Sequence, residues 1–502
     1  MGISSRATKI AAAATAAGLL AAGTAGWARH DSHHSDSGPK TPQQVNMYDS
    51  PAVSLVVNHE SARVTWRLAE PDIDALVRFV NTDPTAVAAW RASDFGTASD
   101  AMVNEPMAHP ARYLAPGAAT STEASMTHTG TGWGVSTNGY FVTNHHVVAP
   151  TDRDSWVREG TEATDSRPSA VDRVAAELAT QLTAIHWGAH PVNLSPADQT
   201  AIADLAQRWV EAETTVTDPA EQVTIGGGQN VAVDDQGMTA RIVTTSKRTW
   251  PHTDVAILEV DAMNLPTIPL GDDATLQVGD TVHALGYPGD ASFGTGLSQH
   301  AMVTATMSSG QVTNRLRSTD GFSAIEDSAT INHGNSGGPL VDASGRVVGI
   351  VTAVDPSTEE ANGVNGGKFF YAVPVSEVKK FLRSEGILPL QSPDQATYQH
   401  AMDLMHQSHY SAALGQLKQV QLHGFSSEYV RMHTEMDKTA VAHGRDVPVH
   451  DVRRLWEAGL ALLGAVVAVA GCVLSLRRRQ ATSVRTADHG RNGNARDHAF
   501  PY

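Results

Sequence analysis

The chain has 502 residues, a length typical of about three domains. Its 53 acidic and 36 basic residues give a formal net charge of −17, which argues against a general nucleic-acid binder because such proteins carry a basic surface. The single cysteine excludes a disulfide scaffold and a cysteine-based zinc module. A hydrophobic content of 41% is enough for sizeable cores and argues against wholesale disorder.

Residues 1–28 are typical of a signal peptide or an N-terminal membrane anchor. Arg6 and Lys9 form a positive region, and an Ala-rich apolar stretch follows as far as Ala28. Small residues at Gly26 and Ala28 suit a cleavage site, although an uncleaved anchor fits the same pattern. Both alternatives predict export of the region that follows.

Residues 29–120 are predicted to form a linker and an N-terminal extension to which the sequence assigns no fold. His30, His33 and His34 lie among Ser, Asp, Gly and Pro residues, so a solvated linker is favoured over a metal site. A helix is expected near 84–92. Three prolines, at 106, 110 and 116, indicate a linker into the next unit.

The pattern of residues changes at about residue 121, and the new pattern continues to residue 388. Short β-branched runs alternate there with Gly- and Asn-containing turns, which favours an antiparallel barrel or sandwich. The runs are Tyr140–Val148, Val255–Val260, Thr281–Leu285, Val347–Val351 and Phe369–Val373. A polar, helical insertion at 152–215 interrupts them, with Ser195 and Pro196 as N-cap and first residue of one helix. The insertion is expected to cover a cleft, bind a partner or decorate the surface.

The last part of the chain is predicted to be helical and membrane-bound. Residues 389–455 have apolar and small residues at helical spacing, as in one tetratricopeptide-like hairpin or a generic helical pair. A transmembrane helix is expected at 456–476, where 19 residues from Ala458 carry no charge. Arg477, Arg478 and Arg479 then begin a basic tail, 477–502, expected on the cytoplasmic side.

Three separated segments carry the chemistry. Ser336 is flanked by glycines in Asn332–Leu340, which allows a tight turn that exposes its hydroxyl and directs the N–H groups of Gly334 and Ser336 toward one point, an oxyanion hole. A serine nucleophile needs a base and an orienting acid. His145 or His146 supplies the base and Asp254 the acid, in the order found in chymotrypsin-like proteases.

These segments resemble the HtrA (Deg) branch of the trypsin-like serine proteases. The matching pieces, in order, are Gly139-Tyr140, Thr143–Val148, Thr253–Leu258, Leu270–Asp272, Gly286–Gly289, Asn332–Gly338 and Tyr371–Pro374. The resemblance implies a mainly β fold: a double six-stranded antiparallel β-barrel, here with a helical insertion, a short C-terminal helical region and a transmembrane helix. It selects His146 as the catalytic histidine because that residue directly precedes Val-Val. It implies catalytic His146, Asp254 and Ser336, with neither a cofactor nor a metal.

The resemblance also bears on specificity and activation. It places Thr330 and Ile331 near the base of the substrate pocket and Thr352, Ala353 and Val354 along its wall. No acid stands at that base, so small aliphatic P1 residues are expected, and a peptide library selecting Arg or Lys would contradict this. Asn335 replaces the aspartate that pairs with a new N-terminus in many zymogens, which favours activation by loop ordering. The helical spacing of apolar residues in 389–455 argues against the PDZ domain that usually follows an HtrA protease.

The leading interpretation is a membrane-tethered serine endopeptidase that acts on proteins or peptides outside the cytoplasm, in envelope quality control or in regulated proteolysis. The other expected partner is the membrane, and homo-oligomers occur among similar proteins. A second hypothesis is an inactive protease fold that serves as an adaptor for partner proteins. A third is an acyl hydrolase with the same nucleophile.

Overall fold

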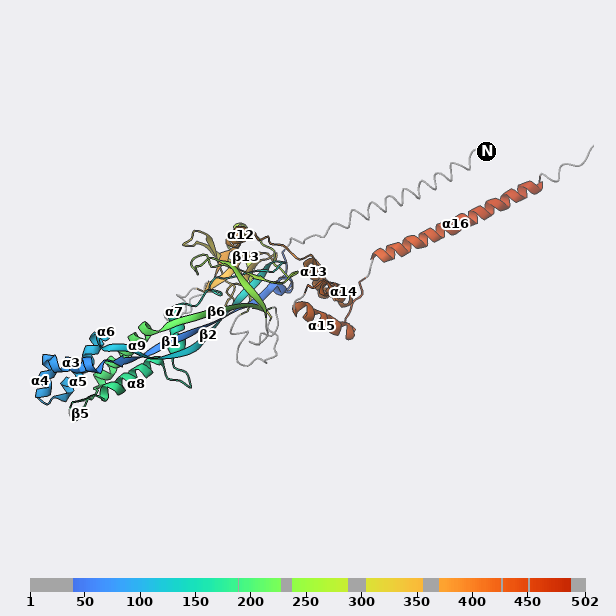
Figure 1. Ribbon diagram of the computed structural model, residues 1–502. Helices are drawn as coiled ribbons and strands as arrows, with labels where there is room; N and C mark the ends of the chain where they lie inside the picture. The colour runs from blue at the N-terminus through green and yellow to red at the C-terminus, as the bar shows by residue number, and fades with distance from the viewer. Residues whose placement is uncertain are drawn as a thin grey trace, which may run out of the picture.

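A computed structural model describes residues 39–187, 189–226, 237–287, 304–354, 370–425, 428–449 and 452–488. Within them the long strands form two closed antiparallel barrels (Figure 1), so the predicted double barrel is confirmed. The first contains, in order around the sheet, β1 (Val53–Pro71), β2 (Leu114–Ser136), β3 (Tyr140–Thr143), β8 (Ala256–Val260), β7 (Met238–Thr245) and β6 (Thr215–Gly226). The second contains β10 (Thr306–Arg317), β11 (Ser323–Asp327), β14 (Phe370–Pro374), β13 (Val347–Val354), β12 (Pro339–Asp342) and β9 (Thr281–Gly286).

The two barrels share one apolar core. Leu55, Trp133 and Val142 from the first barrel belong to the same buried cluster as Leu285 and Val341 from the second. Because burial of apolar surface is the main stabilising force, this shared cluster fixes the barrels against each other. The shared core therefore also fixes the relative positions of the loops that leave the two barrels at their junction.

Strands β1 and β2 continue beyond the barrel as a long ribbon. They remain paired as far as Pro71 and Leu114, and β6 runs along the other side of β1. At about 3.3 Å per residue, the 19 residues of β1 span roughly 60 Å. Val64 and Trp66 are buried whereas the intervening Thr65 is half-buried, which is the alternation of a strand covered on one face.

Helices from two separate parts of the chain cover this ribbon. One set lies between β1 and β2: α3 (Ile73–Thr82), α4 (Pro84–Arg91), α5 (Phe95–Ala108) and α6 (Pro110–Tyr113). The other lies between β3 and β6: α7 (Arg153–Thr161), α8 (Ala170–Thr183), the short strands β4 (His186–Trp187) and β5 (His190–Pro191), and α9 (Pro196–Glu213). Trp66, Leu76, Leu178 and Leu205 form one core that joins both sets to the ribbon. We call the ribbon and these helices the arm.

Figure 1 shows α8 and α9 along the ribbon, away from the barrels. Trp209 of α9 donates its indole N–H to the Arg67 carbonyl of β1, 3.0 Å away. This position argues against a cleft-covering role for α8 and α9. Ser195 caps α9 as predicted, in a reciprocal capping box with Asp198.

The predicted boundary at residue 121 does not follow the strands. β1 lies within 29–120, yet it pairs with β2 and β6 and closes the first barrel. The expected proline linker is likewise absent from the described residues: Pro106 lies inside α5, Pro110 begins α6 and Pro116 lies in β2. The boundary was wrong because the partners of β1 are remote in sequence, and because the outer part of β2 consists mainly of Ala, Thr and Ser.

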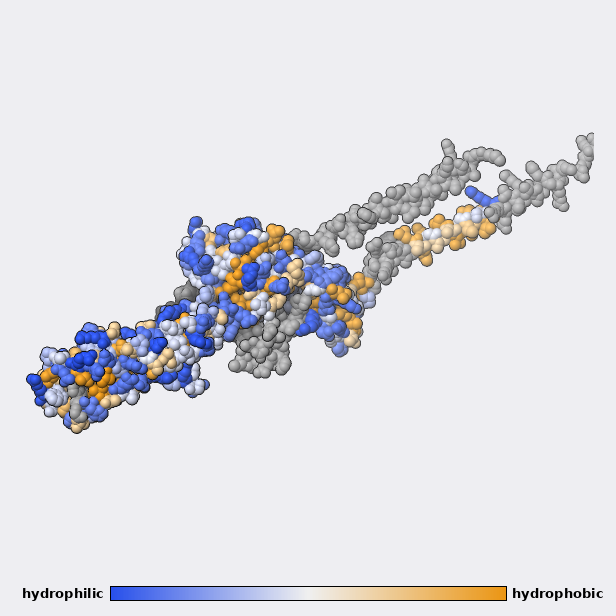
Figure 2. All heavy atoms as spheres, in the orientation of Figure 1, coloured by the Kyte–Doolittle hydropathy of each residue, from blue (hydrophilic) through white to orange (hydrophobic). Residues whose placement is uncertain are grey.

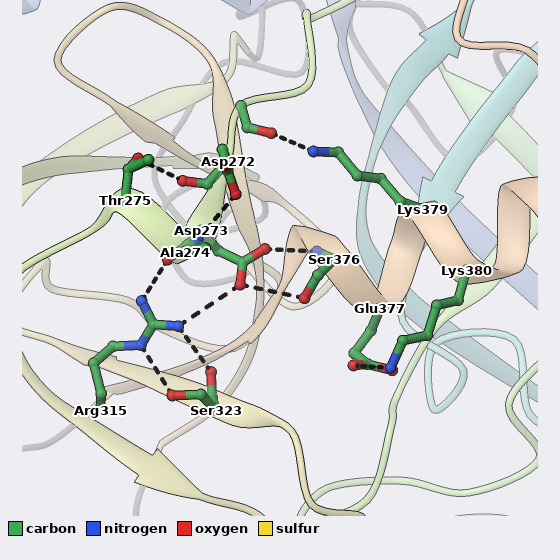
Figure 3. Close-up of polar contacts among 11 residues, drawn as sticks. Asp272, Asp273, Ala274, Thr275, Arg315, Ser323, Ser376, Glu377, Lys379 and Lys380 are labelled. Atoms are coloured by element: carbon green, nitrogen blue, oxygen red, sulfur yellow. Dashed lines mark hydrogen bonds and ion pairs between the residues drawn. The ribbon is translucent and has the colours of Figure 1, made fainter.

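Helix α12 (Val375–Ser384) is tied to the second barrel through Asp273 (Figure 3). Asp273 opens the short 3-10 helix η2 (Asp273–Thr275), and its carboxylate accepts hydrogen bonds from the backbone N–H and the hydroxyl of Ser376, at 2.8 and 3.2 Å. Arg315 of β10 donates to the Asp273 carbonyl at 2.7 Å, and Lys379 donates to the Gly271 carbonyl at 2.5 Å. The Leu270–Asp272 motif of the sequence thus lies where the closing helix of the barrel is attached.

Beyond α12 most of the described residues are helical. Three helices, α13 (Pro393–His406), α14 (Tyr410–Leu422) and α15 (Glu428–Ala442), pack around Tyr398, Leu417 and Phe425. Tyr48 joins this core from α2 (Pro42–Asp49), which precedes η1 (Ser50–Ala52) and β1. The likeness of this region to a tetratricopeptide hairpin stays a prediction.

The last helix, α16 (Val452–Asp488), includes one stretch, Leu460–Arg478, that is long and apolar enough to cross a membrane. None of this stretch is buried against the rest of the protein, and Figure 2 shows its apolar surface. Length and composition alone support this assignment. The predicted signal segment 1–28 and the linker histidines lie outside the described residues, as do residues 489–502 of the tail.

Asp49, at the end of α2, predicts that the stability of the protein depends on pH. Asp49 is fully buried beside Lys40 and Asp342, and burial raises its pKa from 3.8 to about 8. Because its pKa is higher in the folded state, folding takes up a proton, and stability falls as the pH rises from about 4 to about 8. We expect Asp49→Asn to weaken this dependence, so that the variant gains stability relative to the wild type between pH 5 and pH 8. Urea unfolding of both proteins at these two pH values measures the effect, and parallel profiles would contradict it.

Candidate active site

The predicted catalytic segments meet where the two barrels join. β3 ends at Thr143, earlier than the predicted 140–148 strand, and the chain then turns, bringing His146 beside Asp254. Asp254 directly precedes Val255, after which β8 begins. Ser336 lies in the loop between β11 and β12 of the second barrel, whereas the other two residues come from the first.

His146 and Asp254 form a close pair. The Nδ1 atom of His146 lies 2.6 Å from Oδ2 of Asp254, and the backbone N–H of His146 donates to Oδ1 at 3.0 Å. Because Nδ1 is engaged by the carboxylate, Nε2 remains for proton transfer with a substrate-side group. The Asp254 side chain is fully buried, and its contacts fix the orientation of the ring.

Two further side chains hold Asp254. The Thr352 hydroxyl donates to Oδ2 at 2.6 Å, and the Asn144 amide donates to the Asp254 carbonyl at 2.7 Å. The Thr352 bond, with that from the His146 backbone, offsets the cost of burying the carboxylate, and the Asn144 bond holds the backbone of Asp254. His145 is oriented differently: its Nδ1 is buried without a partner among the described residues. Burial lowers the pKa of His145, which favours its neutral form.

Within the serine loop, Gly334–Gly338, two N–H groups have no partner among the described residues. The N–H of Asn335 donates to the Asn332 carbonyl at 3.1 Å, and Gly334 has a φ of 96°, as in a type II turn. The next N–H groups are also engaged, Gly337 with Val351 at 2.8 Å and Gly338 with Asn335 at 2.9 Å. The N–H groups of Gly334 and Ser336, in contrast, have no partner in the described part of the chain.

Ser336 itself is half-buried, and its hydroxyl makes no hydrogen bond with any residue that the structure describes. In free enzymes the bonds between catalytic side chains are often long and shorten when substrate binds. No three His, Cys, Asp or Glu side chains come together as metal ligands within the described ranges.

Comparisons with known proteins agree with this geometry. Residues 130–350 match the family model of the trypsin-like peptidase domain. A probable periplasmic serine endoprotease, DegP-like, from Chlamydia muridarum is 38% identical over 121 residues, which are 24% of this chain and 22% of the relative. The protein of the same description from Pseudomonas putida strain W619 is 35% identical over 155 residues, 30% of this chain and 29% of the relative. The chain therefore spans less than a third of the length of these curated relatives.

Residues 130–350 form a trypsin-like peptidase domain that is similar to the DegP-like serine endoproteases. Among solved structures, the HtrA-type protease AlgW with decapeptide is 20% identical, with a TM-score of 0.32 over 69% of this chain and 67% of that one. The matched residues 130–350 include the three segments described above, while β1 and most of the helices of the arm lie outside the matched range or within its insertion.

The residues predicted to line the substrate pocket differ in their exposure and in their contacts. Thr330 is exposed and Ile331 is buried, just before the serine loop. Thr352 was predicted in the pocket wall, but its hydroxyl is directed to Asp254. Ala353 and Val354 end β13, and their side chains lie outside the described part of the structure. The preference for small aliphatic P1 residues stays a prediction.

Sequence reasoning missed Thr352 and Asn144 as supports of Asp254. Asn144 is adjacent to the histidines, so its position in the motif is a signal that was available. Thr352 is 98 residues from Asp254, and only the closure of the barrels brings the two together. A third residue, Thr131, contacts the serine loop and is considered below.

Gly337 provides a test of how tightly the serine loop is packed. Its φ is 88°, and an added Cβ would lie 2.1 Å from the Thr131 carbonyl oxygen and 2.3 Å from Oγ1 of Thr143. We expect Gly337→Ala to cost at least about 3 kcal/mol of stability, because steric overlap with buried backbone adds to the strain of the left-handed conformation.

Gly279→Ala is the matched control. Its φ is 95°, but no atom lies within 4 Å of the added Cβ, so only the backbone strain of about 1–2 kcal/mol applies. Denaturant unfolding measures both variants. Equal losses would show that the serine loop accommodates the methyl group and is not tightly packed.

Proposed function

We propose that this protein is a membrane-tethered serine endopeptidase that hydrolyses peptide bonds outside the cytoplasm through Ser336, His146 and Asp254. The observation that carries the proposal is the 2.6 Å contact between His146 Nδ1 and the buried Asp254 carboxylate. It is supported by Gly334–Gly338, where the two N–H groups without a partner among the described residues are those of Gly334 and Ser336, as expected of an oxyanion hole.

The mechanism follows from these positions. Nε2 of His146 accepts the Ser336 proton while Oγ bonds to the peptide carbonyl carbon, and the carbonyl oxygen takes up the negative charge. The N–H groups of Gly334 and Ser336 stabilise that charge. His146 then protonates the amide nitrogen, the C–N bond breaks and an ester on Ser336 remains. Water, deprotonated by His146, attacks this ester and releases the acid and the serine. Asp254 stays ionised and stabilises the imidazolium form.

Membrane attachment is supported by α16. Its apolar stretch is exposed along its whole length, and Arg477 and Arg478 follow at its end. Positive residues are enriched on the cytoplasmic side, so the peptidase domain is assigned to the opposite side. The curated relatives are named as periplasmic, which agrees with this topology. Turnover of damaged envelope proteins or cleavage of a specific signalling protein fits such a location.

Ser336→Ala tests the catalytic assignment. A fluorophosphonate probe reacts with activated serines as Oγ displaces fluoride from phosphorus, so we expect it to label the wild type and not the variant. Proteolysis of casein is expected to fall by about 10⁶-fold, to the level left without a nucleophile.

Ser328→Ala is a suitable control, because Ser328 lies between β11 and the serine loop and its hydroxyl contacts Gln311 rather than the site. Casein cleavage by purified Ser336→Ala at the wild-type rate would overturn the proposal. A folded wild type that neither reacts with the probe nor cleaves casein would favour the adaptor hypothesis instead.

Removal of α16 tests the tether. We expect the full chain to remain with membranes after alkaline carbonate extraction, because transfer of the apolar part of Leu460–Arg478 into the bilayer is strongly favourable. A chain that ends at Val449 but keeps its N-terminal segment separates the two possible anchors. Retention of that shorter chain in the pellet would assign the anchoring to residues 1–28, and its release would assign it to α16.

A further inference from the structure

Thr131, near the inner end of β2, contacts the serine loop through both its backbone and its side chain. Its backbone N–H donates to the Ser336 carbonyl at 2.8 Å. Its hydroxyl donates to the Gly334 carbonyl at 2.7 Å. Thr131 is completely buried, so no water competes for these bonds. One residue of the first barrel thus holds the carbonyls of two residues in the second.

The Thr131 hydroxyl also accepts a hydrogen bond. The backbone N–H of Tyr287, which follows β9, donates to it at 2.9 Å. The Thr131 carbonyl, in turn, accepts from the Thr143 hydroxyl at 2.8 Å. A hydroxyl group can donate and accept at once, whereas an aliphatic side chain of the same shape can do neither. The chemistry at this position therefore requires Thr or Ser.

The bond to Gly334 fixes the peptide between the two free N–H groups. That peptide joins Gly334 to Asn335, and it is held at both ends: its carbonyl by Thr131 and its N–H by the Asn332 carbonyl. The N–H groups of Gly334 and Ser336 belong to the peptides on either side. Rotation of the central peptide would turn both of them away from a common point.

We propose that the Thr131 hydroxyl is a positioning group for the oxyanion hole, which sets the direction of the Gly334 and Ser336 N–H groups without touching substrate. This inference rests on the proposed function and deepens it. It predicts that loss of the hydroxyl impairs the chemical step more than substrate binding, because donors are effective only when aimed at the developing charge.

The experiment compares four variants of the full chain in detergent. Thr131→Ala and Thr131→Ser both lack the methyl group and differ only in the hydroxyl, while Thr131→Val keeps the shape without it. Thr267→Val is the matched control: Thr267 is also buried, but its hydroxyl has no partner among the described residues. The readouts are kcat and KM with fluorescein-labelled casein, the rate of fluorophosphonate labelling of Ser336, and thermal unfolding.

We expect Thr131→Ala and Thr131→Val to lose at least about tenfold in kcat and in labelling rate, with KM changed by no more than about twofold. Thr131→Ser is expected to restore most of both rates, and Thr267→Val to match the wild type. Equal rates for the Ala and Ser variants would overturn the proposal. So would a loss of rate that merely follows the unfolded fraction, or failure of both hydroxyl-free variants to fold, because the role would then be structural.

Failure of this inference is distinguishable from failure of the proposed function. A wild type labelled at Ser336, with Thr131→Ala equally reactive, overturns the positioning role alone. A folded wild type that is not labelled overturns both, since there is then no oxyanion hole to position.

Discussion

The buried carboxylate of Asp254 is the constraint on which the proposed active site depends. A carboxylate in the interior is costly unless donors surround it, and here the donors come from both barrels: His146 from the first and Thr352 from the second. The charge is satisfied only when the barrels are packed in one relative position. The shared apolar core that contains Leu55 and Leu285 supplies that position. The orientation of the histidine therefore depends on the packing of the two barrels at their junction.

The serine loop is also held across this junction, but here a residue of the first barrel holds a loop of the second. It belongs to the second barrel, but its carbonyls are bound by Thr131 of the first, and Gly337 fits against the Thr131 and Thr143 oxygens because it has no side chain. Each barrel thus orients a group that the other contributes. Small relative movements of the barrels would disturb the His146–Asp254 pair and the oxyanion donors together, which is why these groups are best regarded as one unit.

The local motifs of the sequence predicted the segments that meet at the junction of the barrels, since glycines around a serine and a histidine before Val-Val are patterns over a few positions. The same sequence did not show that β1 belongs to the barrel, because its partner β2 begins 43 residues later, beyond four helices. It also did not show that Thr352 contacts Asp254, since a contact over 98 residues leaves no local pattern. Long-range pairing, rather than propensity, is what the sequence could not supply.

The arrangement of the outer parts suggests how a tethered peptidase could present its site. Helices α13–α15 contact the peptidase domain through Tyr429, whose hydroxyl accepts the Ala305 N–H at 2.8 Å, just before β10. The backbone N–H of Tyr287, after β9, donates to Thr131, so the paired end of β9 and start of β10 contact both this helical region and the residue that binds the serine loop. In Figure 1, α16 and the arm leave the barrels on opposite sides. With α16 in a membrane, as proposed, the arm would point away from the bilayer.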